Sequence, residues 1–499
     1  MPLPPTSPPA RRGGSASARL LRALTLLSAL ASLAVVGVAG AASESGWSPA
    51  REVTLPPGAT GLPQGYLPVL ACPSSGNCVA AGDYNNAHGQ SQGLLVNEVN
   101  GAWRSPLRIT PPANAAANAA LTPYGTSCAS VGACVSVGTY QDRSNNVRDF
   151  VISEVHGSWQ RAVEVQLPAN ALAKNQLAQL HSVACTSVGN CSAVGTYLET
   201  GTPVATTQAL VVDEVQGQWR VGERITLPPT TNSNPFVTLG QVACSTPGNC
   251  SAIGSYIDSN NVTHGLLVDE IDGRWLPGMS MDLPPNASPY PNASLSSIAC
   301  PGVGDCTATG TYQNARGFIE GLHVNETHDH WNPAVSMPMP PNAATDPHTF
   351  FYGFAGVACP AATTCSVGGQ YRDRNGRYQG FFVNELNGTW QNATQLLLPR
   401  GALMAGKNGG VVSVSCAAVG SCSAGAAYLD GGSNYQGLVV NEVHGVWGTG
   451  LKVTLPGVAA SVGVDGGVYA VVCHPSQCTA VGSYLATATV YQGFLVTTK

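Results

Sequence analysis

Charge is what this 499-residue sequence has least of. Asp, Glu, Lys and Arg together make up 10% of it, against about a quarter in ordinary soluble domains. So little charge argues against a coiled coil and a helix-rich enzyme, and a net charge of −5 provides no basic surface for nucleic acid. Helical periodicity is also absent from the repeats described below. Because 44% of the residues are hydrophobic, wholesale disorder is excluded and a real core is expected.

Long apolar runs are nearly absent too, and the one present is at the N-terminus. Residues 23–38 carry no charge, follow a segment whose charges are all arginines (Arg11, Arg12, Arg19 and Arg22), and precede Ala39-Gly40-Ala41. This order predicts a signal peptide over residues 1–41 and a protein that is secreted or held at the cell surface. An uncleaved anchor is the alternative, but the run is shorter than the roughly 20 residues of a spanning helix. We expect no membrane association once the signal peptide has been removed.

Cysteine, by contrast, is abundant and regularly spaced. Seven pairs are separated by five residues and the last pair by four; the first member of each pair recurs every 56 to 59 residues. The pairs are Cys72/Cys78, Cys128/Cys134, Cys185/Cys191, Cys244/Cys250, Cys300/Cys306, Cys359/Cys365, Cys416/Cys422 and Cys473/Cys478. An exported chain with evenly paired cysteines predicts eight disulfides. Zinc would need four ligands, and a pair supplies two.

All eight tryptophans follow the same repeat, and so does one tyrosine per unit, which lies six residues after the second cysteine of its pair. Each unit has the local signals of four short strands, and the tryptophan usually follows an Asn-Gly, His-Gly, Gln-Gly or Asp-Gly turn. Four antiparallel strands repeated in this way predict an all-β fold, an eight-bladed β-propeller occupying residues 42–499 as a single domain. The last unit lacks its tryptophan strand, and residues 46–56 match it, so we expect this N-terminal strand to complete blade eight. Seven blades plus one extra unit is the lesser alternative.

The Cys-x5-Cys, Ala-Val-Gly and Asn-Gly-x-Trp motifs, taken together, resemble those of a group of secreted actinobacterial repeat proteins. The resemblance spans the whole mature chain and implies a propeller-like fold. It implies no activity, because none is established for that group.

Three repeated residue types are expected to belong to the scaffold. Seven units end their third strand with glutamate, which we expect to accept backbone or indole hydrogen bonds, since catalysis needs one site and not seven. The tryptophans are expected to pack the outermost strand. The tyrosines are expected to pack between blades, with a ring of sugar-stacking aromatics as the alternative.

Function is expected where the repeat is broken. The most distinctive loops follow the tyrosines on the face opposite the cysteine loops, which makes Asp142, Arg143, Arg372, Asp373 and Arg374 candidate ligand-binding residues. Asp-x-Asn fragments there resemble part of a calcium loop, but the distal glutamate such a loop needs is missing. We therefore expect no metal and no cofactor.

Two further motifs were considered for chemistry. His328-Asp329-His330 replaces a hairpin turn, where exposed histidines are more common than metal ligands. The Gly-x-Ser-x-Gly string around Ser91 needs a strand before it and a helix after it, and strands are expected on both sides.

The sequence thus favours an exported, non-catalytic propeller that binds an extracellular glycan or protein through its long-loop face. One alternative is an extracellular glycan-active hydrolase or lyase, which predicts that Asp142, Arg372, Asp373 and Arg374 converge on one sector. Another is a structural component of the cell surface.

Overall fold

The computed structural model describes residues 46–498 except 57, 60–63, 175–176, 201–204, 345–352, 403–408, 457–465 and 488. The predicted signal peptide lies outside the described residues and remains a prediction. The unit that starts at Trp47 consists of strands and turns, and the described residues include no helix. None of them therefore forms a helix capable of crossing a membrane.

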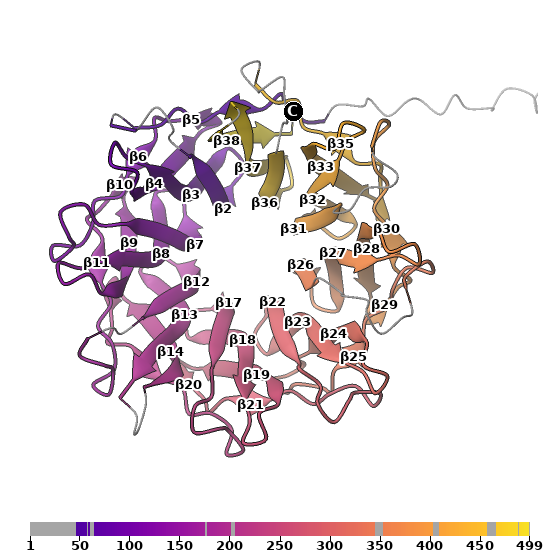
Figure 1. The fold of residues 1–499 in the computed structure, drawn as a ribbon, viewed down its shortest axis with the longest axis horizontal. Coiled ribbons are helices and arrows are strands. Elements are labelled where there is room, and N and C mark those ends of the chain that lie inside the picture. Colours follow the sequence, from indigo (N-terminus) through magenta and orange to yellow (C-terminus); the bar gives the residue numbers. More distant parts are fainter. Residues whose placement is uncertain are drawn as a thin grey trace, which may run out of the picture. The chain divides into compact units, whose positions relative to one another are not determined.

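Eight antiparallel sheets form a closed ring of blades, which confirms the predicted eight-bladed propeller (Figure 1). We number the blades one to eight by their innermost strands, which surround the centre of the ring. These are β2 (Tyr66–Ser74), β7 (Leu121–Ser130), β12 (Gln179–Ser187), β17 (Thr238–Thr246), β22 (Ser294–Gly302), β26 (Gly353–Ala361), β31 (Gly410–Ala418) and β36 (Gly466–His474).

Two longer strands follow in each blade. The second strands are β3 (Asn77–Asn85), β8 (Ala133–Gln141), β13 (Asn190–Glu199), β18 (Asn249–Ile257), β23 (Asp305–Gln313), β27 (Thr364–Arg372), β32 (Ser421–Leu429) and β37 (Gln477–Thr487). The third strands are β4 (Ser91–Val99), β9 (Val147–Val155), β14 (Thr206–Val215), β19 (Thr263–Ile271), β24 (Ile319–Asn325), β28 (Tyr378–Leu386), β33 (Tyr435–Val443) and β38 (Val490–Thr497).

The outermost strand is split into two short pieces in six blades, whereas the sequence predicted one continuous strand. The first pieces are β5 (Ala102–Trp103), β10 (Ser158–Trp159), β15 (Gln218–Trp219), β20 (Arg274–Trp275), β29 (Thr389–Trp390) and β34 (Val446–Trp447). The second pieces are β6 (Leu107–Arg108), β11 (Val163–Glu164), β16 (Glu223–Arg224), β21 (Met279–Ser280), β30 (Thr394–Gln395) and β35 (Leu451–Lys452). Blade five has β25 (Val335–Ser336) alone.

A change of register explains this split. In blade one Trp103 pairs with Glu98 and Leu107 with Leu95, so the outer chain advances by four residues while its partner advances by three. One extra residue on one strand is a β-bulge, which bends the edge of a sheet.

The two ends of the propeller meet in blade eight, as predicted. Strand β1 (Arg51–Glu52) pairs with β38, and Trp47 forms a further bridge with Thr498. Strand β36 in turn contacts β2 of blade one, so the ring is continuous.

Each blade contributes two kinds of connection, one to each face of the ring. The cysteine loop and the turn after the third strand are hydrogen-bonded to each other, as in Gly101 N–H to Gly76 C=O at 2.7 Å. We call this side the turn face. The opposite side, the loop face, carries the loop after each tyrosine and the link that leads to the next blade.

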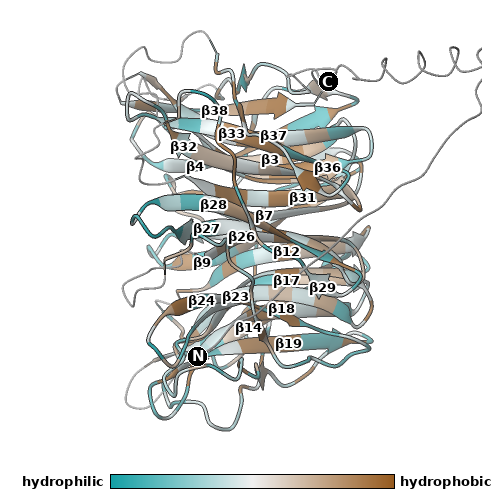
Figure 2. Ribbon diagram, turned by 90° about the vertical axis from the view of Figure 1, so that its right-hand side faces the viewer, coloured by the Kyte–Doolittle hydropathy of each residue, from teal (hydrophilic) through white to brown (hydrophobic). Residues whose placement is uncertain are grey.

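Hydrophobic side chains pack between neighbouring blades, which explains strands that are buried on both sides. Figure 2 shows hydrophobic residues, coloured brown, distributed over the strands of the blades. The glycine in the Ala-Val-Gly motif allows two strands of the same blade to approach closely. A Cβ at Gly195 would lie 2.0 Å from the carbonyl oxygen of Gln179 on the innermost strand, where that strand is bulged. A side chain is therefore excluded there.

All sixteen cysteines form the eight predicted disulfides. Each bridge joins the ends of one cysteine loop, with a sequence separation of six residues in seven blades and five in blade eight. The bonds are Cys72–Cys78, Cys128–Cys134, Cys185–Cys191, Cys244–Cys250, Cys300–Cys306, Cys359–Cys365, Cys416–Cys422 and Cys473–Cys478.

The second cysteine of most pairs is buried between blades, which the spacing alone does not predict. At most 6% of the residue is exposed at Cys78, Cys134, Cys191, Cys250, Cys306, Cys365 and Cys422. Blade eight differs, because it buries Cys473 and leaves Cys478 half-buried.

Several of these sulfurs also meet a hydroxyl group of the preceding blade. A serine or threonine Oγ lies 3.4 to 3.7 Å from the Sγ of Cys78, Cys250, Cys306, Cys365, Cys422 and Cys478. A bridged sulfur carries no proton, so it can only accept a weak hydrogen bond there. The disulfides thus contribute to packing between blades as well as closing their loops.

Candidate functional site

The repeated tyrosines are interblade core residues, as expected. All eight are at most 3% exposed, so they form no surface ring for stacking sugars. In blade six the Tyr371 hydroxyl donates to Asn342 Oδ1 at 2.8 Å, and Tyr140 makes the same bond to Asn114 at 2.9 Å. Burial raises the pKa of Tyr371 to about 12, so it stays a neutral hydrogen-bond donor.

The repeated tryptophans and glutamates connect neighbouring blades on the outer side. Trp159 Nε1 donates to Asn97 Oδ1 of the preceding blade at 3.0 Å, and the Asn97 amide donates to Glu154 Oε1 at 2.6 Å. The tryptophan prediction is thus confirmed, and the glutamates are indeed structural. Glu154, Glu385 and Glu442 accept asparagine amides of the preceding blade, however, and not the backbone or indole groups that we expected.

Blades three and four have aspartate in place of this asparagine. Asp213 and Asp269 stand where blades one, five, six and seven have asparagine, and each accepts the indole N–H of the next blade, from Trp275 and Trp331, at 3.0 Å. Glu270 and Glu326 then face a carboxylate, where Glu154, Glu385 and Glu442 accept an amide.

These two glutamates have strongly shifted acidities. Burial, assisted by the Asp213 carboxylate, raises the pKa of Glu270 to about 7. Burial, assisted by Asp269 and Asp329, raises that of Glu326 to about 8. A cavity of about 280 Å³ on the turn face reaches Asp213 and Glu270. Sequence reasoning missed these pairs, although the Asn-to-Asp change within an aligned series is visible in the repeat.

The loops after the tyrosines are Asx turns, which accounts for their Asp-x-Asn fragments. Asp142 Oδ1 accepts the backbone N–H groups of Ser144 at 2.8 Å and Asn146 at 2.9 Å. Asp258, Asn314, Asp373 and Asp430 make the same pair of bonds in their own blades. A side chain that caps its own turn in this way explains the motif without calcium.

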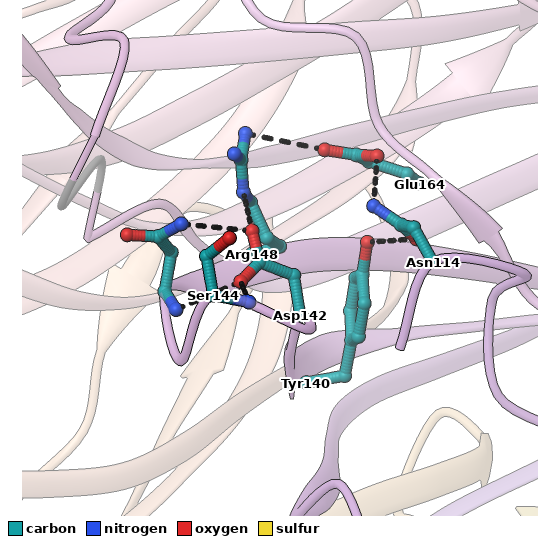
Figure 3. Close-up of polar contacts among 7 residues, drawn as sticks. Asn114, Tyr140, Asp142, Ser144, Arg148 and Glu164 are labelled. Carbon is teal, nitrogen blue, oxygen red and sulfur yellow. Dashed lines mark hydrogen bonds and ion pairs between the residues drawn. The ribbon is translucent and has the colours of Figure 1, made fainter. Parts of the chain in front are cut away.

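Blade two extends its Asx turn into a charged network (Figure 3). Arg148 bridges Asp142 Oδ2 at 2.9 Å and Glu164 Oε1 at 3.2 Å, and Glu164 Oε2 accepts the Asn114 amide. Burial opposes ionisation of Asp142, but hydrogen bonds from Asn146, Arg148 and Ser144 outweigh it and lower its pKa to about 2. Asp142 is therefore committed to the scaffold.

The five candidate residues do not come together. Asp142 and Arg143 belong to blade two, and Arg372, Asp373 and Arg374 belong to blade six, so three blades separate the two groups in either direction around the ring. The convergence that the enzyme alternative predicts is not found. Asp373, 5% exposed, is occupied by its own turn.

Blade six nevertheless borders two cavities on the loop face. The first, which we call the five/six cavity, has a volume of about 380 Å³ and is lined by Arg316, Phe318, Met339, Arg372 and Arg374, among others. The second, the six/seven cavity, has about 550 Å³ and lies on the other side of the same loop, with Asp373, Asn375 and Arg377 in its wall.

Alternate residues of the blade-six loop thus line different cavities. Arg374 Nη2 donates to the carbonyl oxygen of Pro341 at 2.8 Å, which attaches its guanidinium to the link from blade five. Arg143 makes the equivalent contact with Ala113 at 2.7 Å. Sequence reasoning found Arg372 and Arg374 but missed Arg316, because a different blade supplies it.

No metal centre is apparent in the part of the chain that the structure covers: it has no group of three or more His, Cys, Asp or Glu side chains suited to an ion. His328, Asp329 and His330 are exposed, and the first two have positive φ, as a tight turn requires. Ser91 lies at the start of β4 and follows β3, so the nucleophile motif has strands on both sides, as expected.

No family model and no curated protein matches the chain. Among solved structures, it is similar to a polysaccharide lyase of a new family, an ulvan lyase, at 10% identity and a TM-score of 0.42 over 72% of this chain and 89% of that one. It is similar to the six-bladed fucose-binding lectin of Aleuria aurantia at 13% identity and a TM-score of 0.32 (69% and 98%). For a Trypanosoma rangeli sialidase the values are 9% and 0.35 (87% and 54%). With TM-scores below 0.5, these likenesses carry no argument about function, and the fold rests on the strand pairing.

Proposed function

We propose that this protein is an exported, non-catalytic β-propeller that binds an extracellular glycan or protein on the loop face of blades five to seven. The signal-peptide pattern and the eight disulfides support export, because such bonds persist in oxidising compartments. The resemblance of its motifs to those of secreted actinobacterial repeat proteins also supports export.

The observation that carries the proposal is the position of the two cavities. Both flank the blade-six loop, on the face where rigid blades present their connections. Volumes of about 380 and 550 Å³ lie within the roughly 300–1,000 Å³ of small-molecule sites.

The polar groups of the six/seven cavity suit a ligand rich in hydroxyls. Asn342 donates to Gln395, Gln395 to Gln379, and Gln379 to Asp373, at 3.1 to 3.2 Å. These amides retain further donors and acceptors, because each carries two of each.

A glycan array and a pull-down from extracellular extracts would test this with the folded protein. We expect selective retention of a glycan or a protein, abolished by Asn375→Trp, which introduces bulk into the wall of the six/seven cavity. Blank results in both assays would refute the binding proposal and favour the structural alternative. Turnover of a bound glycan would instead favour the enzyme alternative.

A further inference from the structure

We propose that the five/six cavity takes the acidic group of a polysaccharide, a carboxylate or a sulfate ester, and holds it with Arg316 and Arg374 beside Arg372. This inference rests on the proposed function and names the class of ligand at that same site.

The first support is the local charge. Three arginines line the five/six cavity, and Arg377 lines the wall of the six/seven cavity beside it. Without the predicted signal peptide and its four arginines, the chain has a net charge of −5 − 4 = −9. A cationic cavity on an anionic protein selects for an anionic ligand.

Glu320 is the single carboxyl group among the described residues that line this cavity, and neutral donors hold it in place. Glu320 accepts the amide of Asn286 at 3.1 Å, the amide of Asn314, and the Tyr312 hydroxyl. Its oxygens are thus satisfied within blade five and the adjoining link.

The second support is that these arginines break the repeat. Arg316 stands four residues after its tyrosine, where the other units have histidine, asparagine or small residues. Arg372 directly follows its own, where the other units have neutral residues. The scaffold therefore does not require arginine at either position.

The apolar part of the wall fits a sugar better than a bare ion. Phe318, Ile319, Met337 and Met339 line the same cavity as the arginines. Sugar rings present C–H faces that pack on aromatic and aliphatic side chains, while a guanidinium binds carboxylate or sulfate through two parallel hydrogen bonds. A small anion would use the arginines and leave this apolar surface in water.

The blade-six loop also offers a path for a longer chain. Tyr371, Arg372 and Arg374 line the five/six cavity, while Asp373, Asn375 and Arg377 line the six/seven cavity. A polysaccharide lying across this loop would place an acidic sugar in the first cavity and hydroxyl groups against the amides of the second.

The test is affinity measured by calorimetry for polygalacturonate, dextran sulfate and neutral dextran, with single-stranded DNA as a polyanion of another class. We expect one acidic polysaccharide to bind, and the two acidic arms to show whether carboxylate or sulfate is preferred. Arg316→Gln combined with Arg374→Gln should weaken binding at least tenfold.

Arg143→Gln is the matched control, because Arg143 makes the same link contact in blade two. We expect it to alter affinity less than twofold. Equal binding of dextran, equal binding of DNA, or equal losses in both variants would each overturn the inference. Binding of neutral glycans that Asn375→Trp abolishes would overturn the acidic ligand while upholding the proposed function; absence of any glycan or protein ligand would overturn both.

Discussion

On the outer side of this ring, the blades differ in whether one position carries an asparagine amide or an aspartate carboxylate. An asparagine amide between a tryptophan and a glutamate donates to one and accepts from the other, as Asn97 does for Glu154 and Trp159. Aspartate keeps the acceptor and loses the donor. Because Asp213 and Asp269 present a charge and no donor, they add to the effect of burial in raising the pKa values of Glu270 and Glu326.

Neighbouring charges act differently on the two carboxyl pairs, Asp213 with Glu270 and Asp269 with Glu326. Burial raises the pKa of Asp213, and Arg220 offsets part of that rise. Near Glu326, by contrast, Asp269, Asp305 and Asp329 all add to the effect of burial. The interface between blades four and five should therefore be the more sensitive to pH.

The first prediction concerns stability against pH. Folded-state pKa values of about 7 and 8, above the 4.5 of ordinary glutamate, mean that the folded protein holds protons that the unfolded chain releases between about pH 4.5 and 8. The free energy of unfolding should fall as pH rises through that window. Asp213→Asn with Asp269→Asn should restore the asparagine pattern and raise stability at pH 8.5 by on the order of 1 kcal/mol per pair, with little effect at pH 4.5.

Urea unfolding at both pH values measures this effect. Asn97→Asp, the reverse change, is the control and should destabilise the protein at pH 8.5. Parallel pH profiles for wild type and variants would show that the carboxyl pairs are not coupled to folding.

Strands and turns recur from blade to blade more regularly than individual residue types do, so the sequence predicted these elements well. The hairpin turns, the alternating strands and the cysteine spacing are local signals, and they determine four strands per unit. The split outer strand was missed because the bulge between Trp103 and Leu107 depends on how the outer strand pairs with the third strand, and no residue type marks it. The Asx turns could not be recognised from the sequence, since an aspartate such as Asp142 or Asp373 caps a turn as readily as it binds a ligand.

The second prediction concerns the disulfides. Each closes a short loop, and loop-closure entropy gives about 2 kcal/mol per bridge. Cys185→Ala with Cys191→Ala should therefore lower the free energy of unfolding by about that amount, measured in urea. The same change at Cys244 and Cys250 is a matched control and should have a similar effect. No loss in either variant would contradict a stabilising role.

The unit from Trp47 onward is a ring whose first and last described strands share one blade. That closure was predictable, because residues 46–56 match a strand that the last unit lacks. The site was only partly predictable. Arg372 and Arg374 stood out in the sequence, but Arg316 and the methionines of the link join them only through the packing of blade five on blade six.

The third prediction tests the closure. Trp47, 8% exposed, packs against blades seven and eight and donates to Asn441 Oδ1 at 3.1 Å. Trp47→Ala should cost about 3 kcal/mol and increase hydrogen exchange in β36, β37 and β38. Trp275→Ala, at a similarly buried tryptophan within the ring, should leave exchange in blade eight unchanged. Unchanged exchange in blade eight of Trp47→Ala would contradict closure by the N-terminal strand.

The most direct test of a binding function on the loop face is hydrogen exchange of the protein with and without its captured glycan or protein partner. The account predicts protection of residues 314–320, 340–344 and 371–379, which border the two cavities, and no change in the blade-two loop from Asp142 to Arg148. Protection confined to the turn face, or spread evenly around all eight blades, would contradict it.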